Sequence, residues 1–320
     1  MSNQTPLKII FAGSGEFGLP TLKAVQLAGH EIVQVYSQPD KPAGRGRTLT
    51  PTPIAQYAIE QKLPLLCTDS LNSQILPVAD VMIVIAFGQK ISDAIANHAK
   101  YGSVNLHASL LPAYRGAAPI HWAILRGETV TGNSIIRLAQ KMDAGAVLEQ
   151  SRLVIGETET TGELHDRLSE DGAPLMLSVL QKLADGTSLE SVQNESLATS
   201  APKLSRDSAM VDFTQPPDKV SRQIRGLYPW PGCKVKLIQF GSDGLEKEIA
   251  RLTLVRGSVD QTPHSSQAQP GEILANGNIA CDATGSVQIL EVQPEGKRPM
   301  KLSDFKNGKP WCAGMRLLAI

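Results

Sequence analysis

The sequence shows no excess of charge of either sign and no long apolar run. Its 31 Lys and Arg residues balance 31 Asp and Glu residues over 320 positions. Overall charge therefore does not draw the chain to a polyanion, and nucleic-acid binding would need a local basic patch. The longest apolar stretch, Val78 to Gly88, is interrupted by Asp80 and is too short to cross a bilayer. These absences argue against a membrane protein.

Cysteines are few and show no paired spacing. The four of them lie far apart and none forms a CxxC pair, which argues against a disulfide framework or a zinc module and fits a reducing compartment. The first residues carry no apolar signal core, so we expect the protein in the cytoplasm. The four cysteines are Cys67, Cys233, Cys281 and Cys312.

The first half of the chain alternates apolar strands with helices, within an ordinary globular composition of 42% hydrophobic and 19% charged residues. Unbroken apolar strands separated by helices are typical of a parallel sheet covered on both faces. We therefore predict a Rossmann-like, doubly wound α/β fold with its crevice beyond the carboxyl ends of the strands. The expected strands are Leu7–Ala12, Glu31–Tyr36, Asp80–Ala86, Ser103–Leu106 and Ser134–Leu138, and the expected helices are Thr21–Ala28, Ile54–Lys62 and Leu164–Ala184.

The second half begins with a polar, weakly periodic stretch and continues in short strands. Turn residues punctuate these strands, which suggests a small β-barrel or sandwich. We expect an α/β domain over residues 1–187, a linker over 188–207 and a β domain over 208–320. The expected β-domain strands are Lys234–Phe240, Ile249–Val255, Gly271–Leu274 and Ser286–Val292.

A GxGxxG pattern over Gly13–Gly18 follows the first strand and allows two interpretations. One is a dinucleotide site with a pyrophosphate at the helix N-terminus and Asp40 near the ribose, as in an NAD(P)-dependent oxidoreductase. The other is a tight turn that needs small residues. Glu16 would repel a phosphate, and Pro20 suits a helix that starts after the glycines, so both residues favour the turn.

Asn105, His107 and Asp143 form the first candidate catalytic set. Asn105 and His107 alternate on one strand and so point to the same side, and Asp143 follows the strand Ser134–Leu138. An amide can hold an oxyanion, an imidazole can move protons, and a carboxylate can orient the imidazole or accept a proton from an amine. Acyl transfer is the reaction that this set can perform, and hydrogen-bonded structure is the alternative.

A long polar loop, Asp40–Pro51, carries the cations Lys41, Arg45 and Arg47 among glycines and prolines. Arginine suits bidentate contact with phosphate, and glycine lets the backbone approach a ligand. A solvated loop without a ligand is the alternative, although loops of this length in α/β domains are often functional.

Three motifs resemble the methionyl-tRNA formyltransferase family. Asn105–Ile120 reads NLHASLLPAYRGAAPI and resembles the family's N-x-H-x-SLLPxxRGAAPI block. Asp143-Ala144-Gly145 resembles the D-[AT]-G that follows this block in formyltransferases that use 10-formyltetrahydrofolate. Ser37–Gly46 resembles the family's TQPDRPAGRG insertion loop, and the similarity runs from Ile9 to Arg316.

The resemblance implies an N-terminal catalytic domain and a C-terminal OB-like barrel that binds tRNA. It implies transfer of a formyl group from the co-substrate 10-formyltetrahydrofolate to the α-amino group of methionyl initiator tRNA, without a metal or NAD. We also expect a monomer. Asn105, His107 and Asp143 match the catalytic residues, Ser109, Leu110, Leu111 and Pro112 match the folate-binding stretch, and Lys41, Arg45 and Arg47 lie in the loop that enters the acceptor stem.

Two other functions stay open beside the oxidoreductase. A related formyltransferase would act on a nucleotide sugar or a purine precursor, which the basic loop argues against. An inactive RNA-binding protein would not need the complete trio of Asn105, His107 and Asp143.

Two departures from the family pattern stand out. Gln140-Lys141-Met142 replaces an acid and a glycine before Asp143, and Tyr228 replaces an asparagine before Pro229. We expect the first departure to affect folate affinity more than the chemistry, since the trio is intact.

Overall fold

The computed structural model describes residues 6–43, 48–241, 244–262, 268–282 and 285–320. The chain divides into two compact units, each built from several segments. The N-terminal unit comprises Met1–Pro119, Thr131–Leu153 and His165–Ala201, and the C-terminal unit comprises Ile120–Val130, Val154–Leu164 and Pro202–Ile320. None of the helices in the described ranges has the length and apolar character needed to span a membrane.

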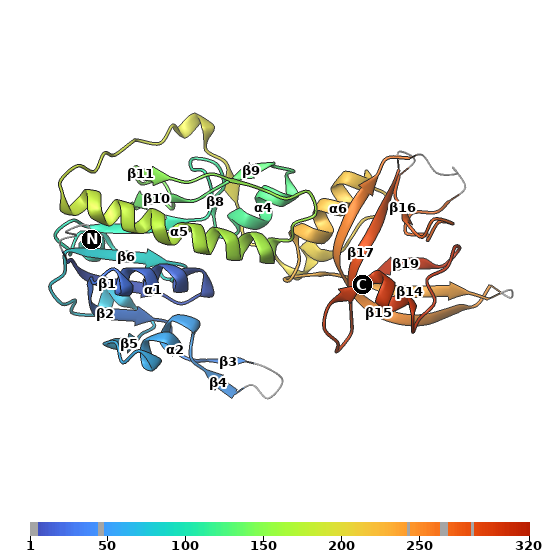
Figure 1. The fold of residues 1–320 in the computed structure, drawn as a ribbon, viewed down its shortest axis with the longest axis horizontal. Helices are drawn as coiled ribbons and strands as arrows, with labels where there is room; N and C mark the ends of the chain where they lie inside the picture. The colour runs from blue at the N-terminus through green and yellow to red at the C-terminus, as the bar shows by residue number, and fades with distance from the viewer. Residues whose placement is uncertain (1–5, 44–47, 242–243, 263–267, 283–284) are drawn as a thin grey trace. The chain divides into compact units, whose positions relative to one another are not determined.

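A seven-stranded sheet forms the centre of the N-terminal unit (Figure 1). Its strands are, in spatial order, β11 (Val147–Gln150), β10 (Ser134–Arg137), β7 (Ser103–His107), β6 (Val81–Ile85), β1 (Lys8–Gly13), β2 (Glu31–Ser37) and β5 (Leu65–Cys67). The five strands from β7 to β5 run parallel, whereas β10 runs antiparallel to both of its neighbours. The predicted α/β class is confirmed, and the carboxyl ends of the parallel strands meet at one edge.

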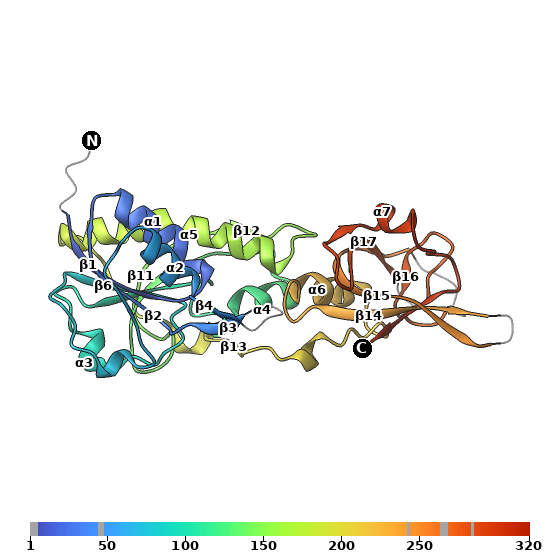
Figure 2. The same cartoon turned by 90° about the horizontal axis from the view of Figure 1, so that it is seen from below.

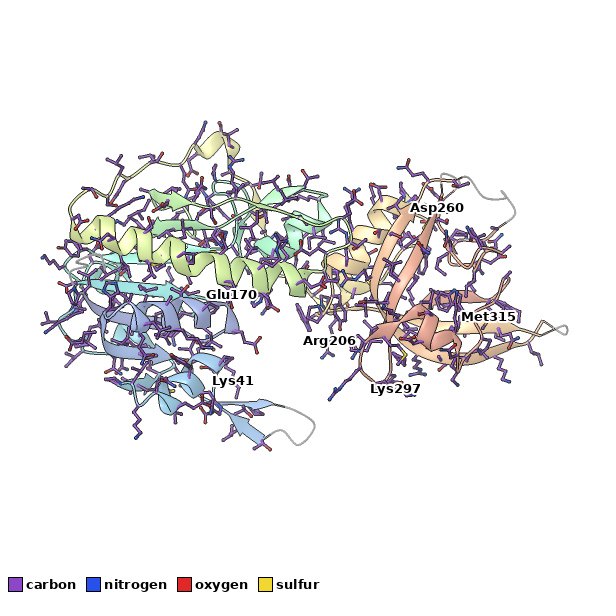
Figure 3. The ribbon with its side chains drawn as sticks, viewed as in Figure 1. Lys41, Glu170, Arg206, Asp260, Lys297 and Met315 are labelled. Atoms are coloured by element: carbon purple, nitrogen blue, oxygen red, sulfur yellow. The ribbon has the colours of Figure 1, made fainter. Side chains whose placement is uncertain are left out.

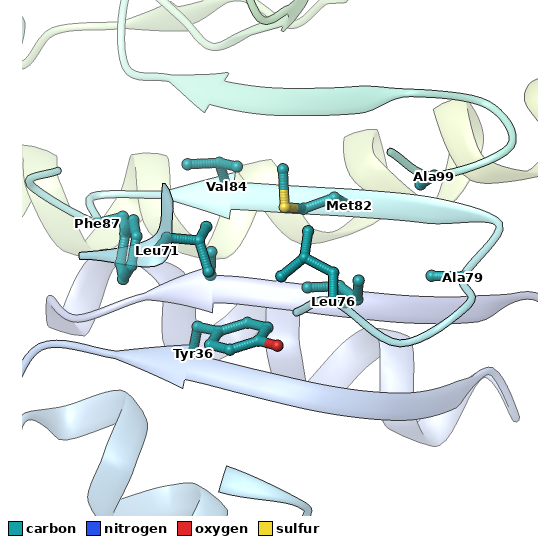
Figure 4. Packing of buried hydrophobic residues seen from close by; sticks show 10 residues of the cluster. Tyr36, Leu71, Leu76, Ala79, Met82, Val84, Phe87 and Ala99 are labelled. Atoms are coloured by element: carbon teal, nitrogen blue, oxygen red, sulfur yellow. The ribbon is translucent and has the colours of Figure 1, made fainter. Parts of the chain in front are cut away.

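The central strands of the sheet, such as β1 and β6, are buried on both faces, which explains why they are almost continuously apolar. On one face, Tyr36 and Met82 pack against Leu71 and Leu76 from the connecting segments (Figure 4). The other face is covered by helices, and Figure 2 shows α1 and α5 on the same side of the sheet. Fully burying one side chain of this size contributes roughly 1.5–3 kcal/mol, so this core holds the strand ends in place.

Helices cover the sheet and connect its strands. Thr52 caps α2, because its Oγ1 accepts a hydrogen bond from the Ala55 N–H at 3.2 Å. Glu163 Oε2 accepts from the Thr160 N–H at 2.9 Å in a capping box, so α5 begins at Thr161 rather than at the predicted Leu164. The helices are α1 (Leu19–Leu27), α2 (Pro53–Glu60), α3 (Asp93–Ala96), α4 (Pro119–Leu125), α5 (Thr161–Ala184), α6 (Pro217–Gly226) and α7 (Leu302–Lys306), with short turns η1 (Glu16–Gly18), η2 (Leu71–Ser73), η3 (Glu195–Leu197) and η4 (Arg206–Ala209).

The C-terminal unit contains an antiparallel sheet that nearly closes into a barrel, as predicted. Its spatial order is β16 (Ile279–Ala280), β17 (Ser286–Pro294), β15 (Glu246–Asp260), β14 (Cys233–Phe240) and β19 (Arg316–Ala319), and β18 (Met300–Lys301) pairs with β17. Isolated bridges join Glu272 to Arg316 on one side and Ile273 to Ile279 on the other. The prediction of a strand over Gly271–Leu274 was wrong: Gly271 has a φ of +84°, which interrupts extended backbone, and only bridges form there.

Short strand pairs complete the fold. One pair joins the segment predicted as a linker to the N-terminal unit, because β13 runs parallel to β8 and Ala201 lies opposite Gly116. The domain boundaries at 187 and 208 remain a prediction. These short strands are β3 (Lys41–Ala43) with β4 (Thr48–Thr50), β8 (Arg115–Gly116) with β13 (Ser200–Ala201), and β9 (Val130–Thr131) with β12 (Leu153–Val154).

Candidate active site

Strand β7 places Asn105 and His107 two residues apart, on one face and near one edge of the sheet. Asn105 is half-buried between its partners Val84 and Ile136. Its side-chain amide has no hydrogen-bond partner among the residues that the structure describes. A half-buried amide without a partner is ready to donate to a carbonyl oxygen of a ligand.

The imidazole of His107 is buried and held in one orientation. Its Nε2 lies 2.9 Å from the carbonyl oxygen of Tyr114. Since a carbonyl oxygen only accepts, we infer that Nε2 carries a hydrogen and donates it. The other ring nitrogen, Nδ1, lies 3.6 Å from Oδ2 of Asp143. Nδ1 is therefore the ring atom that can exchange a proton beside Asp143.

Asp143 has a left-handed backbone, with a φ of +54°. Its Oδ2 accepts a hydrogen bond from the Gly116 N–H at 2.8 Å, and its side chain is 14% exposed. No group within the described ranges hydrogen-bonds to Oδ1. The carboxylate is thus fixed at one oxygen and open at the other, as a proton acceptor for a bound amine needs to be.

The path of the chain to Asp143 differs from the expected one. β10 is antiparallel to β7, with Ser134 opposite His107 and Arg137 opposite Val104. Its carboxyl end therefore points away from the edge at which β7 ends, and the position of Asp143 after this strand does not by itself bring it to the crevice. The following loop comes back to β10 at Arg137, where Gly145 and Ala146 lie, and it brings the Asp143 carboxylate next to His107.

The stretch predicted to bind folate, Ser109–Pro112, is tied down by hydrogen bonds. The fully buried Ser109 Oγ donates to the Ala113 carbonyl at 2.7 Å, so this hydroxyl supports the loop itself. Ser134 Oγ donates to the Ser109 carbonyl at 2.6 Å, and Gln150 Nε2 donates to the Leu111 carbonyl at 3.0 Å. Leu110 and Pro112 are half-buried and Leu111 is buried. Contact of this stretch with a folate stays a prediction.

Three residues that the sequence analysis did not select form a chain of contacts that starts at Asp143: Gln193, Arg115 and Glu195. Gln193 Nε2 donates to the carbonyls of Asp143 and Gly145, both at 2.8 Å. Gln193 Oε1 accepts from Nη2 of the buried Arg115 at 2.7 Å, and Arg115 also pairs with Glu195 at 2.7 Å. Arg115 is 78 positions from Gln193 and 80 positions from Glu195 in the sequence, and no local sequence pattern connects them.

The Gly13–Gly18 turn is a close-packed turn. A Cβ on Gly13 would lie 2.9 Å from the Ile85 carbonyl oxygen, and one on Gly18 would lie 3.4 Å from the Ile85 side chain. Helix α1 begins at Leu19, after the glycines, as the tight-turn interpretation expects. Packing accounts for these two glycines without a dinucleotide.

One of the three predicted tRNA-binding cations, Lys41, lies on the β3–β4 hairpin. Lys41, which is labelled in Figure 3, is exposed on β3, and its Nζ donates a hydrogen bond to Gln38 Oε1. Arg45 and Arg47 lie outside the described residues. In the ranges that the structure describes, no group of three or more His, Cys, Asp or Glu side chains is placed to hold a metal ion.

Comparison with known families decides what kind of protein carries this site. Residues 7–180 match the family described as formyl transferase, and residues 203–310 match the formyl transferase C-terminal domain. The chain belongs to the formyl transferase family.

Relatives and solved structures extend this finding. The chain is 38% identical to a methionyl-tRNA formyltransferase of Methylococcus capsulatus, over 97% of this chain and 99% of the relative. It is 37% identical to a protein of the same name from Moorella thermoacetica, over 96% and 98%. The structure of a sugar 3N-formyl transferase, WlaRD, solved with dTDP and 5-N-formyl-THF, has a TM-score of 0.63 at 15% identity, covering 92% of this chain and 100% of that one. At this identity the likeness shows the fold alone.

The departure at Lys141 has a structural counterpart within the formyl transferase unit. Lys141 pairs with Glu195, which also pairs with Arg115. The hydrogen bonds from Arg115 and Lys141 lower the pKa of the Glu195 carboxyl to about 2. Lys141 therefore shares the single carboxylate of Glu195 with Arg115.

Proposed function

We propose that this formyl transferase moves the formyl group of 10-formyltetrahydrofolate to the α-amino group of methionyl initiator tRNA. The observation that carries the proposal is the cluster of Asn105, His107 and Asp143, held together in a chain whose full-length relatives bear the name methionyl-tRNA formyltransferase. The product, N-formylmethionyl-tRNA, is the substrate of translation initiation.

Each residue of the cluster has a role that follows from its geometry. As the amine of the methionyl group bonds to the formyl carbon, charge develops on the formyl oxygen, and the unpartnered amide of Asn105 donates to that oxygen. In this proposal His107 keeps its Nδ1 beside the Asp143 carboxylate, because its Nε2 is engaged with the Tyr114 carbonyl. The open Oδ1 of Asp143 accepts the proton that the attacking amine loses. The bond between the formyl carbon and folate N10 then breaks as N10 takes up this proton, which returns Asp143 to its carboxylate form.

The acceptor tRNA has separate candidate contacts. In the first half of the chain these are Lys41, Arg45 and Arg47 of the polar segment Asp40–Pro51. In the C-terminal unit, exposed cations such as Arg206 and Lys297 (labelled in Figure 3) are candidates for phosphate contacts. We propose further that the enzyme acts as a cytoplasmic monomer, which sedimentation of the purified protein tests.

The decisive experiment supplies both substrates. The purified protein is incubated with 10-formyltetrahydrofolate and methionyl initiator tRNA, and the amino acid released from the tRNA is analysed by mass spectrometry. Formylmethionine is the expected product. A parallel reaction offers an amino sugar nucleotide instead of tRNA. Formylation of the sugar alone would overturn the proposal in favour of a small-molecule formyltransferase.

A further inference from the structure

Gln193 uses its whole side-chain amide to join two parts of the site. Its side chain is buried, its Nε2 donates to the carbonyls of Asp143 and Gly145, and its Oε1 accepts from Nε and Nη2 of Arg115 at 3.1 and 2.7 Å. Both donors and both acceptor positions of the amide are occupied. No other residue type has this combination of two donors and an acceptor at this length.

The backbone of Asp143 needs such support. An aspartate with a φ of +54° occupies a region that side-chain-bearing residues populate only when their surroundings hold them there. Two residues on, Gly145 lies so close to the Arg137 carbonyl oxygen that a Cβ would be 1.8 Å from it. Gln193 binds the two carbonyls on either side of Ala144 and so fixes the orientation of this turn.

The short strand β8 helps to fix both the backbone and the carboxylate of Asp143. Arg115 of β8 reaches the Asp143 backbone through Gln193, and the next residue, Gly116, donates its N–H directly to the Asp143 carboxylate. Arg115 is itself fixed by a two-pronged pair with Glu195, at 3.1 and 2.7 Å. Backbone and carboxylate of Asp143 are thus set by one connected group of contacts.

We propose that Gln193, held by Arg115, is a positioning residue that aims the Asp143 carboxylate at the reacting amine. This inference rests on the proposed function, since it assigns Asp143 as the proton acceptor. It places part of the reaction centre in the stretch 188–207, which the sequence pattern alone predicts to be a linker.

The test compares two substitutions in the same stretch. Gln193→Glu keeps the size of the side chain and can still accept from Arg115, but its carboxylate cannot donate to the two carbonyls and repels them. Glu190→Gln is the matched control: Glu190 ties the stretch to Arg137 at 2.8 Å and makes no contact with Asp143. Thermal unfolding establishes that both variants are folded, and Gln193→Ala provides a second, neutral substitution.

We expect Gln193→Glu and Gln193→Ala to lower kcat by about tenfold or more, because small displacements of a reacting group are costly. KM for both substrates should stay within about threefold, and Glu190→Gln should retain the wild-type kcat. In an Asp143→Asn background, Gln193→Glu should cause little further loss of single-turnover rate, since two residues that act through one group are not additive.

Three results would overturn the inference: wild-type kcat in Gln193→Glu, an equal loss in Glu190→Gln, or a loss that is fully additive with Asp143→Asn. A wild-type protein that formylates no tRNA is a different outcome, because it contradicts the proposed function before any variant is compared. The kcat of the wild type with methionyl initiator tRNA separates the two failures.

Discussion

Asp143 and the β3–β4 hairpin belong to the same unit but are held in opposite ways. The Asp143 turn is fixed by contacts from Gly116 and Gln193, and the nearby His107 and Arg115 are buried. On the hairpin, by contrast, every residue whose side chain is described is exposed, and Leu49 is 65% exposed. Proton transfer needs atoms fixed within a few tenths of an ångström, whereas contact with tRNA phosphates needs reach and charge. We therefore propose that the Asp143 region sets the rate of the reaction and that the hairpin selects the acceptor.

The largest expected effect comes from removing the proton acceptor. Asp143→Asn keeps the size of the side chain but replaces a carboxylate oxygen by an amide group. We expect kcat to fall by roughly a hundredfold to ten-thousandfold, as for a lost general base, while the unfolding temperature changes little. Steady-state kinetics with methionyl initiator tRNA measures this, and a folded variant with a near-normal rate would remove Asp143 from the mechanism.

A smaller loss is expected at the oxyanion donor. Asn105→Ala deletes an amide that acts mainly on the developing charge, at a cost of roughly 3 kcal/mol or about a hundredfold in kcat. Affinity for 10-formyltetrahydrofolate, measured by fluorescence titration or calorimetry, should stay near the wild-type value. If the variant binds folate poorly and keeps its rate at saturation, Asn105 is a binding residue only.

These two positions illustrate what the sequence could predict. Asn105 and His107 alternate on one strand, so their common face follows from the period of two. The strands β1, β2 and β6 were located to within one residue, and β1 and β6 are recognisable because burial on both faces makes them almost continuously apolar. Local patterns of this kind need no knowledge of the fold.

The support of Asp143 could not be predicted in this way. Gln193 and Arg115 are 78 positions apart and meet only after the chain has folded. The direction of β10 could not be predicted either, because the sequence of a four-residue strand is the same whether the strand runs parallel or antiparallel to its neighbour. Contacts between distant segments leave no spacing that a single sequence displays.

On the hairpin, Arg45→Ala should change recognition rather than rate. Loss of one phosphate contact should raise KM for tRNA and reduce the slope of log affinity against log salt by about 0.9, with folate affinity unchanged. Lys41→Ala is a matched loss of one cation on the described part of the hairpin. Binding measured at several salt concentrations checks both variants, and an unchanged slope together with an unchanged KM would leave the hairpin without a role in binding tRNA.

The smallest expected effect is a change in stability at Glu195, the residue that pairs with Arg115. Hydrogen bonds from Arg115 and Lys141 hold the pKa of Glu195 at about 2, below its ordinary value of 4.5. A lowered carboxyl pKa contributes stability that is fully present above pH 4.5 and is lost as the pH falls towards 2. The unfolding temperature of the wild type should therefore fall more steeply between pH 5 and about pH 3 than that of Glu195→Gln. If the two proteins show the same dependence of unfolding temperature on pH, these ion pairs do not contribute to stability.

The division between a fixed reaction centre and an exposed recognition hairpin is tested most directly by rapid-mixing single-turnover rates. The rate of formyl transfer is measured against tRNA concentration, at saturating 10-formyltetrahydrofolate, for the wild type, Asp143→Asn and Arg45→Ala. We predict that Arg45→Ala reaches the wild-type rate at high tRNA concentration, whereas Asp143→Asn remains slow at every concentration. A slow Arg45→Ala at saturation beside a normal Asp143→Asn would contradict the account.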